Sequence, residues 1–273
     1  MKKLRLITMA ALMLLIVVAC DGQGLYEGGE KLCVASWNVQ NLFDGKEDGA
    51  EYDEYKAASG WDNVAYKKRL ENVGTVISYL PRAKDYILVL NEVESTDVVE
   101  DIVKLAKVSG LGIRWYACTS EENSAIQTAV VSSVPISEAH IHAVGDGLRP
   151  VLEVRFETTR GLVVVFAVHF KSNVGGVAET AEARAMAASV VADVARQVEQ
   201  ENPGCLMLVC GDMNDECWAK DGVMRDGGPL PVSSGFGRRL WNCFWMDERY
   251  GLWPSGSYLY HRSGTKNVDR NPF

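Results

Sequence analysis

Polar residues of a few chemical types follow the apolar runs of this sequence, at the points where those runs end. The run CLMLV leads directly into CGDMND, YILVL leads into NEVE, and VVVFAV leads into HFKSN. A run this apolar is typical of a strand buried on both faces, so each polar cluster marks the place where a strand leaves the core. Each cluster alone is equally consistent with a solvated turn. The clusters are Asn38–Asn41, Asn91–Glu94, His169–Asn173, Gly211–Asp215 and Asn267–Asp269.

Together these clusters supply carboxylates, amides and one imidazole, which suit a hard divalent cation. Mg²⁺ prefers oxygen ligands, keeps several waters and commonly takes one or two carboxylates plus a substrate phosphate. Glu92 suits the ligand role, and Asp212 can orient an attacking water. Asn214 can donate its amide to a phosphoryl oxygen, and His169 can donate to the same phosphate as charge builds there. Gly211 would let the backbone turn sharply before Asp212.

Apolar periodicity and a capping pair predict three helices around these clusters. Apolar residues recur at 4-3-4-3 spacing from Tyr66 to Leu80, and Pro81 marks the end of that helix. Asp97, followed three residues later by Glu100, can cap a second helix. A third helix is longer and places most of its apolar residues on one side. The predicted helices span about 61–81, 97–107 and 177–201.

Short β-rich segments alternate with these helices. We predict strands at 32–38, 86–94, 113–120, 128–136 and 205–212, and a hairpin over 151–170 that turns at 158–161. Helices interleaved with both buried strands and hairpin strands favour a mixed α/β fold, with two β-sheets face to face and helices outside. Residues 31–273 are long enough, and apolar enough, for one domain with a substantial core.

The order WNxxN, NEVE, HFKSN and GDMND resembles the endonuclease/exonuclease/phosphatase family of metal-dependent phosphoesterases. The resemblance implies a four-layer α/β sandwich with the site where the strand termini meet. It implies Mg²⁺, with Mn²⁺ as an alternative, and hydrolysis of phosphate esters, the substrate being nucleic acid, a nucleotide or a lipid headgroup. Asn38 matches an asparagine that holds phosphate and metal, and Glu92 matches the main metal-binding glutamate. Asp212 and Asn214 match the pair of residues that orients the nucleophile and the phosphate. The resemblance also places Asp212 in the metal site.

Other positions carry the resemblance further. His169 matches the phosphate-contacting histidine, and Lys171 and Asn173 beside it are expected to bind substrate. Arg184 resembles a recurring supporting arginine, although an exposed helix cation explains it equally well. Gln40 stands where the family often has an acidic residue, which would weaken metal binding.

The end of the sequence departs from the family pattern, which closes with Ser-Asp-His. The chain stops after SYLYHRSGTKNVDRNPF, where Asp269 matches an aspartate that would orient that last histidine. His261 is the nearest substitute, but it precedes Asp269 and does not fit. We therefore expect a C-terminally incomplete domain with its last strand missing and with weak or no activity. The alternative is a non-catalytic lipoprotein that uses the same scaffold as a binding surface.

Two further readings stay open. His140 and His142 alternate on a predicted strand and could bind a metal, although a strand-edge pair is the commoner case. The late tryptophans Trp241, Trp245 and Trp253 give some support to a glycan- or protein-binding module, although aromatic residues there more often pack a long loop.

The first nineteen residues have the composition of a secretory signal. A basic start is followed by the apolar run LITMAALMLLIVVA, which is short for a membrane span. VVAC resembles a bacterial lipoprotein cleavage box, in which Cys20 becomes the lipidated first residue. We expect a signal peptide at 1–19, a flexible tether at 20–30 and a location in the bacterial cell envelope. An ordinary signal peptide or an uncleaved anchor is the alternative.

The charge of the chain limits its partners. The formal net charge is −8, and loss of three cations with residues 1–19 leaves 25 basic against 36 acidic residues, a formal −11. Such a protein repels polyanions at long range, so a divalent cation must supply local positive charge if the substrate is a phosphate ester. No aromatic and basic stripe marks a groove for single-stranded nucleic acid. We expect a monomer anchored to the membrane through Cys20.

Overall fold

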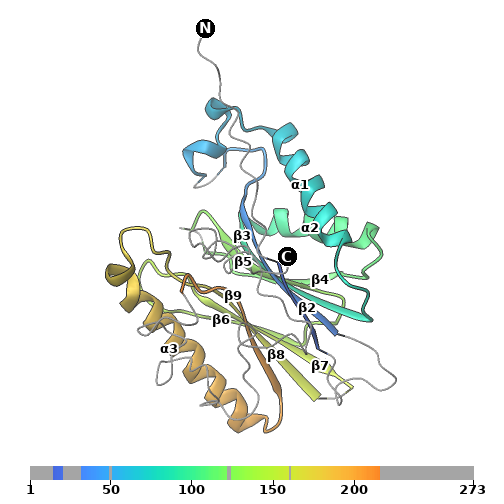
Figure 1. Ribbon diagram of the computed structural model, residues 1–273, viewed down its shortest axis with the longest axis vertical. Helices are drawn as coiled ribbons and strands as arrows, with labels where there is room; N and C mark the ends of the chain where they lie inside the picture. Colours follow the sequence, from blue (N-terminus) through green and yellow to red (C-terminus); the bar gives the residue numbers. More distant parts are fainter. Residues whose placement is uncertain (1–14, 21–31, 49–50, 122–123, 160, 216–273) are drawn as a thin grey trace, which may run out of the picture.

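Two β-sheets lie face to face, with helices on both outer surfaces (Figure 1). The computed structural model describes residues 15–20, 32–48, 51–121, 124–159 and 161–215. One sheet has the strand order β1-β2-β3-β5-β4 and the other β6-β7-β8-β9. The strands are β1 (Leu15–Cys20), β2 (Leu32–Leu42), β3 (Asp85–Val93), β4 (Trp115–Cys118), β5 (Gln127–Ser132), β6 (Glu138–His142), β7 (Val151–Thr158), β8 (Gly161–His169) and β9 (Leu206–Asp212). The predicted α/β sandwich is confirmed.

The continuous apolar runs follow from burial of the central strands on both faces. In β3, Ile87 and Val89 pack between the two sheets, whereas Leu88 and Leu90 pack under the helices. The strands of the second sheet alternate in the same way, because successive side chains point to opposite faces. Four layers result, in the order α1 and α2, first sheet, second sheet, α3 (Figure 1).

Three helices cover the sheets, as the periodicity predicts. They are α1 (Asn63–Ser78), α2 (Thr96–Val108) and α3 (Val177–Glu201). Asp62 caps α1 by accepting from the backbone N–H groups of Val64 and Ala65. The predicted capping pair of α2 is wrong: Ser95 is the N-cap and accepts from Val98, and Asp97 lies inside the first turn. Ser95, two positions before the expected cap, accepts from one of the first-turn N–H groups that have no partner within the helix.

The strand pairing brings distant polar clusters to one end of the sandwich. Strands β2 and β3 are parallel with Asn38 beside Asn91, and β8 and β9 are parallel with His169 beside Asp212. Parallel strands end on the same edge of a sheet, so each pair delivers two polar side chains together. The two sheets then place both pairs at a common end.

Strand β1 lies within the segment that the sequence predicts to be a signal peptide. It pairs antiparallel with β2, from Leu15 beside Trp37 to Cys20 beside Leu32. The signal peptide and the tether stay predictions. Of the residues that the structure describes, no helix has the length and apolarity needed to cross a membrane. Asp269, His261 and the late tryptophans lie outside the described residues.

Candidate active site

Glu92, His169 and Asp212 meet at the end of the sandwich where their strands terminate. Each offers a ligand atom, and these atoms all lie within 4.8 Å of one another. The His169 side chain is 4% exposed and that of Glu92 18% exposed. Residues separated by 120 positions in the sequence therefore form one small, partly buried cluster, which we call the acidic centre.

Asn38 holds the two carboxylates of the acidic centre together. Its Nδ2 donates to Glu92 Oε1 at 2.7 Å and to Asp212 Oδ2 at 3.1 Å. Its Oδ1 accepts from the Gln40 backbone N–H at 2.9 Å. A single amide thus links both sheets, since Asn38 and Glu92 belong to one and Asp212 to the other. In this arrangement Asn38 orients the carboxylates, and its role as a metal ligand stays a prediction.

The backbone around the acidic centre adopts the left-handed conformation unusually often. Of the residues that the structure describes, four non-glycine residues have positive φ: Gln40, Asn41, Glu92 and Asn214. All four belong to the polar clusters at the strand ends. One consequence is that the Asn41 N–H donates to Glu92 Oε2 at 2.9 Å. Left-handed residues other than glycine cost free energy and concentrate where geometry serves a function.

Gly211 permits the close approach that the sequence predicts for it. Its φ is +130°, and a Cβ added there would lie 1.9 Å from the carbonyl oxygen of Val168. No side chain fits between β9 and β8 at this point. The strand therefore carries Asp212 directly beside His169, and the Phe170 N–H donates to the Asp212 carbonyl at 2.9 Å.

Two amides fix the end of β9. Asn91 is fully buried; its Nδ2 donates to the Val168 carbonyl at 2.9 Å, and its Oδ1 accepts from the Asp212 N–H at 3.0 Å. Asn214 donates through its backbone N–H to Asp212 Oδ1 at 2.9 Å and through Nδ2 to the Phe170 carbonyl at 3.1 Å. Both carboxylate oxygens of Asp212 thus have donors that set their direction.

Burial and like charge decide the protonation of the acidic centre. Burial raises the pKa of Glu92, the nearby Asp212 carboxylate raises it further, and hydrogen bonds from Asn38 and Asn41 oppose this. Burial, together with the positive charge of Arg149, lowers the pKa of His169 to about 4. His169 is therefore neutral near pH 7. Its Nε2 lies 3.7 Å from Glu92 Oε1 as a polar contact between an imidazole and a carboxylate.

The acidic centre fits a divalent cation. Two carboxylates held side by side lower each other's tendency to ionise, and a cation between them reverses that effect. Nδ1 of His169 is buried and has no hydrogen-bond partner among the described residues, so a further polar group is needed there. Glu92 and Asp212 would hold a metal ion, and carboxylate oxygens favour Mg²⁺ or Mn²⁺.

The remaining predicted site residues lie at different distances from this centre. Lys171 is exposed and lines a cavity that His169 borders. Asn173 is exposed, and its backbone carbonyl accepts from Gly176 in the loop before α3. Their roles in substrate binding stay predictions.

Arg184 is a buried support and not an exposed helix cation. It is 2% exposed, and its guanidinium donates to the carbonyls of Lys171 and Val177 and to Thr180 Oγ1. The loop between β8 and α3 is thereby tied to α3.

Arg149 is a residue of the site that the sequence does not reveal. It stands in a Gly-rich loop, DGLRP, with no flanking motif. Its charge contributes to the lowered pKa of His169 and opposes the rise in the pKa of Glu92, so it lies near the acidic centre. The only sequence signal is its position immediately before Pro150 and β7, and that signal is weak.

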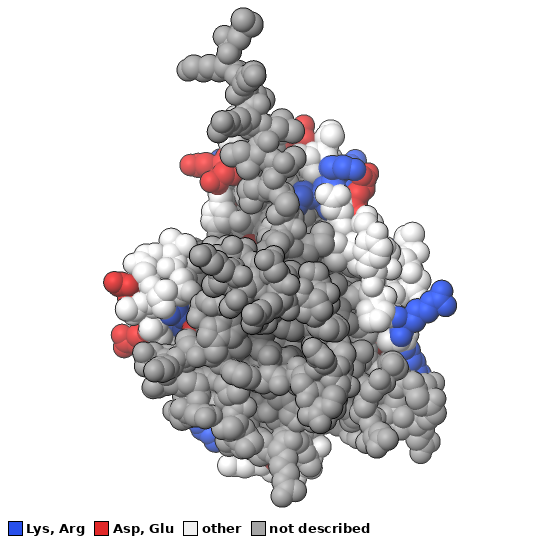
Figure 2. Space-filling view, viewed as in Figure 1, with Lys and Arg blue, Asp and Glu red and all other residues white. Residues whose placement is uncertain are grey.

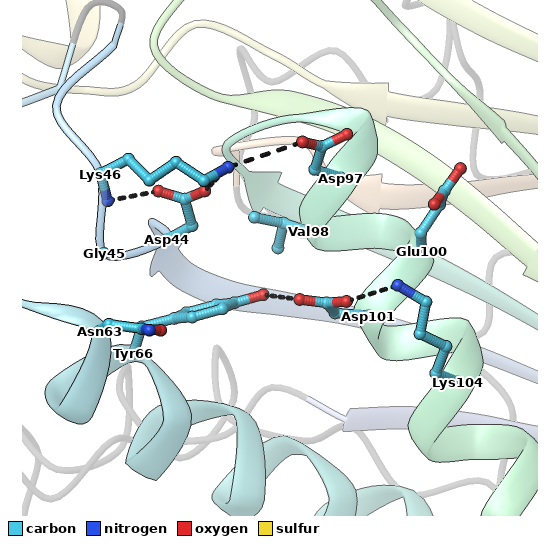
Figure 3. A pocket seen from close by; sticks show the side chains of 10 residues that line it. All are labelled: Asp44, Gly45, Lys46, Asn63, Tyr66, Asp97, Val98, Glu100, Asp101 and Lys104. Atoms are coloured by element: carbon cyan, nitrogen blue, oxygen red, sulfur yellow. Dashed lines mark hydrogen bonds and ion pairs between the residues drawn. The ribbon is translucent and has the colours of Figure 1, made fainter.

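A second cavity beside α2 has a different character. Acidic and basic side chains line it, and most are already paired with each other (Figure 3). Tyr66 donates its hydroxyl to Asp101 at 2.9 Å, and Asp101 also accepts from Lys104 at 2.9 Å. Lys46 pairs with Asp44 at 2.9 Å. These pairs join α1, α2 and the preceding loop, and they indicate a structural role.

A second acidic group consists of Asp48, Glu51 and Glu94, whose carboxylate oxygens also lie within 4.8 Å of one another. Two of its carboxylates hold the backbone of the neighbouring loop: Glu94 accepts from the Asp44 N–H at 2.6 Å, and Glu51 accepts from the Asp48 N–H at 3.0 Å. Burial, together with neighbouring acids, raises the pKa of Glu94 to about 7. This group shapes the loop after β2.

His140 and His142 occur at the edge of a sheet, on β6. His140 contacts Glu138 at 3.1 Å, and His142 contacts the buried Glu153 at 2.7 Å. Burial alone would raise the pKa of Glu153, but hydrogen bonds from His142 and Arg155 hold it below its ordinary value. The two imidazoles thus serve as partners of carboxylates, His140 of one on β6 itself and His142 of one on the neighbouring β7.

On the face shown in Figure 2, the described charged residues are scattered, with acidic and basic side chains intermixed at its edges. The described part of this face has no continuous basic patch of the kind that binds polyanions.

The protein is an α/β sandwich with two carboxylates and an imidazole gathered at its strand ends, an arrangement typical of hydrolases. The sequence pattern described as "Endonuclease/Exonuclease/phosphatase family" matches residues 33–245. The chain therefore belongs to the endonuclease/exonuclease/phosphatase family, as its motifs indicate. No curated protein matches the chain.

Solved structures with a similar fold include two TDP2 proteins and one beta toxin. TDP2 from C. elegans is 19% identical with a TM-score of 0.48, and the match covers 67% of this chain and 48% of that one. A humanized D. rerio TDP2 is 15% identical with a TM-score of 0.49, and the match covers 73% of this chain and 67% of that one. A hairpin-deletion mutant of beta toxin from Staphylococcus aureus is 16% identical with a TM-score of 0.49, and the match covers 70% of this chain and 69% of that one. The chain thus spans about half the length of the C. elegans protein.

Proposed function

We propose that the protein is a metal-dependent hydrolase of phosphodiesters that uses Mg²⁺, with Mn²⁺ as an alternative. The observation that carries the proposal is the acidic centre, in which Glu92, Asp212 and His169 converge within 4.8 Å. Membership of the endonuclease/exonuclease/phosphatase family supports the same reaction class. The negative net charge of the chain adds a physical reason, because a phosphate ester would be repelled without a bound cation.

A metal ion at Glu92 and Asp212 would polarise the phosphoryl group and neutralise the charge that develops on it. The chain's own residues then have separable tasks. Asp212 can accept a proton from the attacking water, and Asn214 fixes the direction of that carboxylate through its backbone N–H. Neutral His169 can donate one N–H to a phosphate oxygen, since its Nδ1 has no partner among the described residues.

The test combines metal binding with turnover. Full-length protein is titrated with MgCl₂ by calorimetry, and hydrolysis of bis(p-nitrophenyl) phosphate is followed with and without EDTA. We expect turnover with Mg²⁺, none in EDTA, and a loss of about 100-fold or more in Asp212→Ala. Asp48→Ala is the matched control, because Asp48 belongs to the second acidic group.

The outcomes separate the hydrolase from a binding scaffold. Equal activity of Asp212→Ala and Asp48→Ala would contradict the assignment of the acidic centre. Magnesium binding without any turnover by folded wild-type protein would contradict the hydrolase itself and favour the scaffold.

We also propose that the chain is exported and anchored through Cys20, on the basis of its signal-like N-terminus. Cleavage before Cys20 would remove most of β1, which spans Leu15–Cys20 and pairs with β2. Labelling with a palmitate analogue tests this: wild type should be labelled and membrane-bound, and Cys20→Ala should lose both properties. Label retained in Cys20→Ala would refute the anchor.

A further inference from the structure

A cavity lies beside the acidic centre, on the other side of His169. Its volume is about 630 Å³, within the range of about 300–1,000 Å³ typical of small-molecule sites. His169 belongs both to its wall and to the acidic centre. The cavity and the acidic centre therefore adjoin each other at His169.

Arg149 lies in the wall of this cavity at the level of His169. Strands β7 and β8 pair Leu152 with Ala167, and the same register carried two residues further sets Pro150 opposite His169. Arg149 is the next residue, and the cavity lining includes it. Its electrostatic effect on both Glu92 and His169 agrees with this position.

Arg149 is half-buried, and its guanidinium has no close partner among the described residues. No hydrogen bond or ion pair involves it within the part of the chain that the structure describes. A partly buried cation is normally paired, because removal from water is costly. Arginine presents a planar fork of donors that matches two phosphate oxygens.

The rest of the lining suits a compact, polar organic group. The lining includes threonine, serine and glutamine residues together with apolar residues such as Phe170 and Leu148. Lys171 adds a second cation, while Glu121 and Asp146 add two acids. Mixed lining of this kind fits an alcohol with both apolar surface and hydrogen-bonding groups.

We propose that this cavity receives one of the two organic groups esterified to the substrate phosphate, and that Arg149 binds a non-bridging oxygen of that phosphate. The substrate class is then a phosphodiester with one compact, polar ester group. This inference rests on the proposed function and deepens it. A nucleoside and a small lipid headgroup share this chemistry, so the experiment distinguishes them.

The experiment measures binding and turnover separately. Full-length protein with MgCl₂ is titrated by calorimetry with thymidine 5′-monophosphate and with phosphocholine, and bis(p-nitrophenyl) phosphate hydrolysis gives KM and kcat. The variants are Arg149→Gln, Arg149→Lys and Ala183→Phe, the last of which fills the cavity from α3. Arg196→Gln, an exposed arginine of α3, is the matched control.

We expect Arg149→Gln to weaken binding of the preferred ligand and to raise KM by about tenfold each, with kcat changed less. Arg149→Lys should recover part of the loss, since a lysine keeps the charge without the fork. Ala183→Phe should weaken ligand binding by a similar factor. Thermal unfolding of each variant shows that the protein remains folded.

Each outcome bears on the inference. Preference for thymidine 5′-monophosphate assigns a nucleoside ester, and preference for phosphocholine assigns a headgroup ester. Binding by wild type of neither ligand, or KM and Kd of Arg149→Gln within twofold of wild type, overturns the inference. Arginine-dependent ligand binding without hydrolysis of any diester would retain the cavity assignment and refute the proposed function alone.

Discussion

Replacement of Asn91 by alanine tests how the two sheets are joined at the acidic centre. Asn91 lies on β3 in the first sheet and is fully buried. Its amide donates to the Val168 carbonyl on β8 and to Thr128 Oγ1, and its Oδ1 accepts from the Asp212 N–H. Two of these three hydrogen bonds cross to the second sheet. Asn91→Ala would therefore remove the hydrogen bonds that fix the position of Asp212 relative to the first sheet.

The expected magnitude follows from the groups left without partners. The Val168 carbonyl and the Asp212 N–H each lose a hydrogen bond, and the alanine side chain cannot replace either one. A buried backbone group left unsatisfied costs about 1–3 kcal/mol. Thr128 is affected less: its Oγ1 loses the Asn91 donor, while its backbone N–H still donates to Thr119 Oγ1. The free energy of unfolding should fall by about 3–5 kcal/mol, a large part of the roughly 5–15 kcal/mol by which folded domains are stable.

Urea unfolding followed by circular dichroism measures this loss. Thr128→Val should cost only about 1 kcal/mol, because it removes one side-chain acceptor. Asn173→Ala is the matched control, since Asn173 is exposed in the described structure, and it should change stability by less than about 0.5 kcal/mol. If Asn91→Ala were no less stable than Asn173→Ala, the cross-sheet hydrogen bonds would not hold the sandwich as described.

Two other perturbations follow from the same strand ends. Gly211→Ala should lower the free energy of unfolding by at least about 3 kcal/mol, because the new Cβ would lie 1.9 Å from the Val168 carbonyl oxygen. Gly147→Ala is the control in the same urea assay. Gly147 also has a positive φ, but open space surrounds it, so this change should cost about 1 kcal/mol. Glu94 has a folded pKa of about 7 against 4.5, owing first to burial, so the folded state binds more protons between these values and stability falls as pH rises through that window. Glu94→Gln should abolish a pH-dependent loss of roughly 1–2 kcal/mol, measured by thermal unfolding from pH 4 to 8; an unchanged slope would contradict the burial of this carboxyl.

The sequence predicts the fold well where burial imposes a simple pattern. Strands such as β3 are apolar on both faces because each face packs against a different layer, and a continuous apolar run records that directly. The helix α3 is predicted because its apolar residues recur at helical spacing. The N-cap of α2 is missed by two residues, since Ser95 and Asp97 are both good caps and only the backbone decides between them.

The acidic centre is predictable in its residue types and not in its internal hydrogen bonds. Strand ends rich in carboxylates and amides indicate that Glu92, His169 and Asp212 meet. The sequence gives no sign that Asn38 bridges two carboxylates or that Asn91 crosses between sheets, because both contacts depend on how the sheets stack. Arg149 is hidden for the same reason, since its proximity to His169 comes from the register of β7 on β8.

The local structure of the acidic centre opposes stability, and this supports a binding role. Four left-handed residues, two carboxylates placed side by side, and a buried imidazole nitrogen without a described partner each raise the free energy of the folded chain. Most of the described core elsewhere is apolar. A cation between Glu92 and Asp212, and a phosphate oxygen at His169, would relieve the last two of these costs at once. The features that disfavour the folded chain alone are therefore the features that favour a bound cation and phosphate.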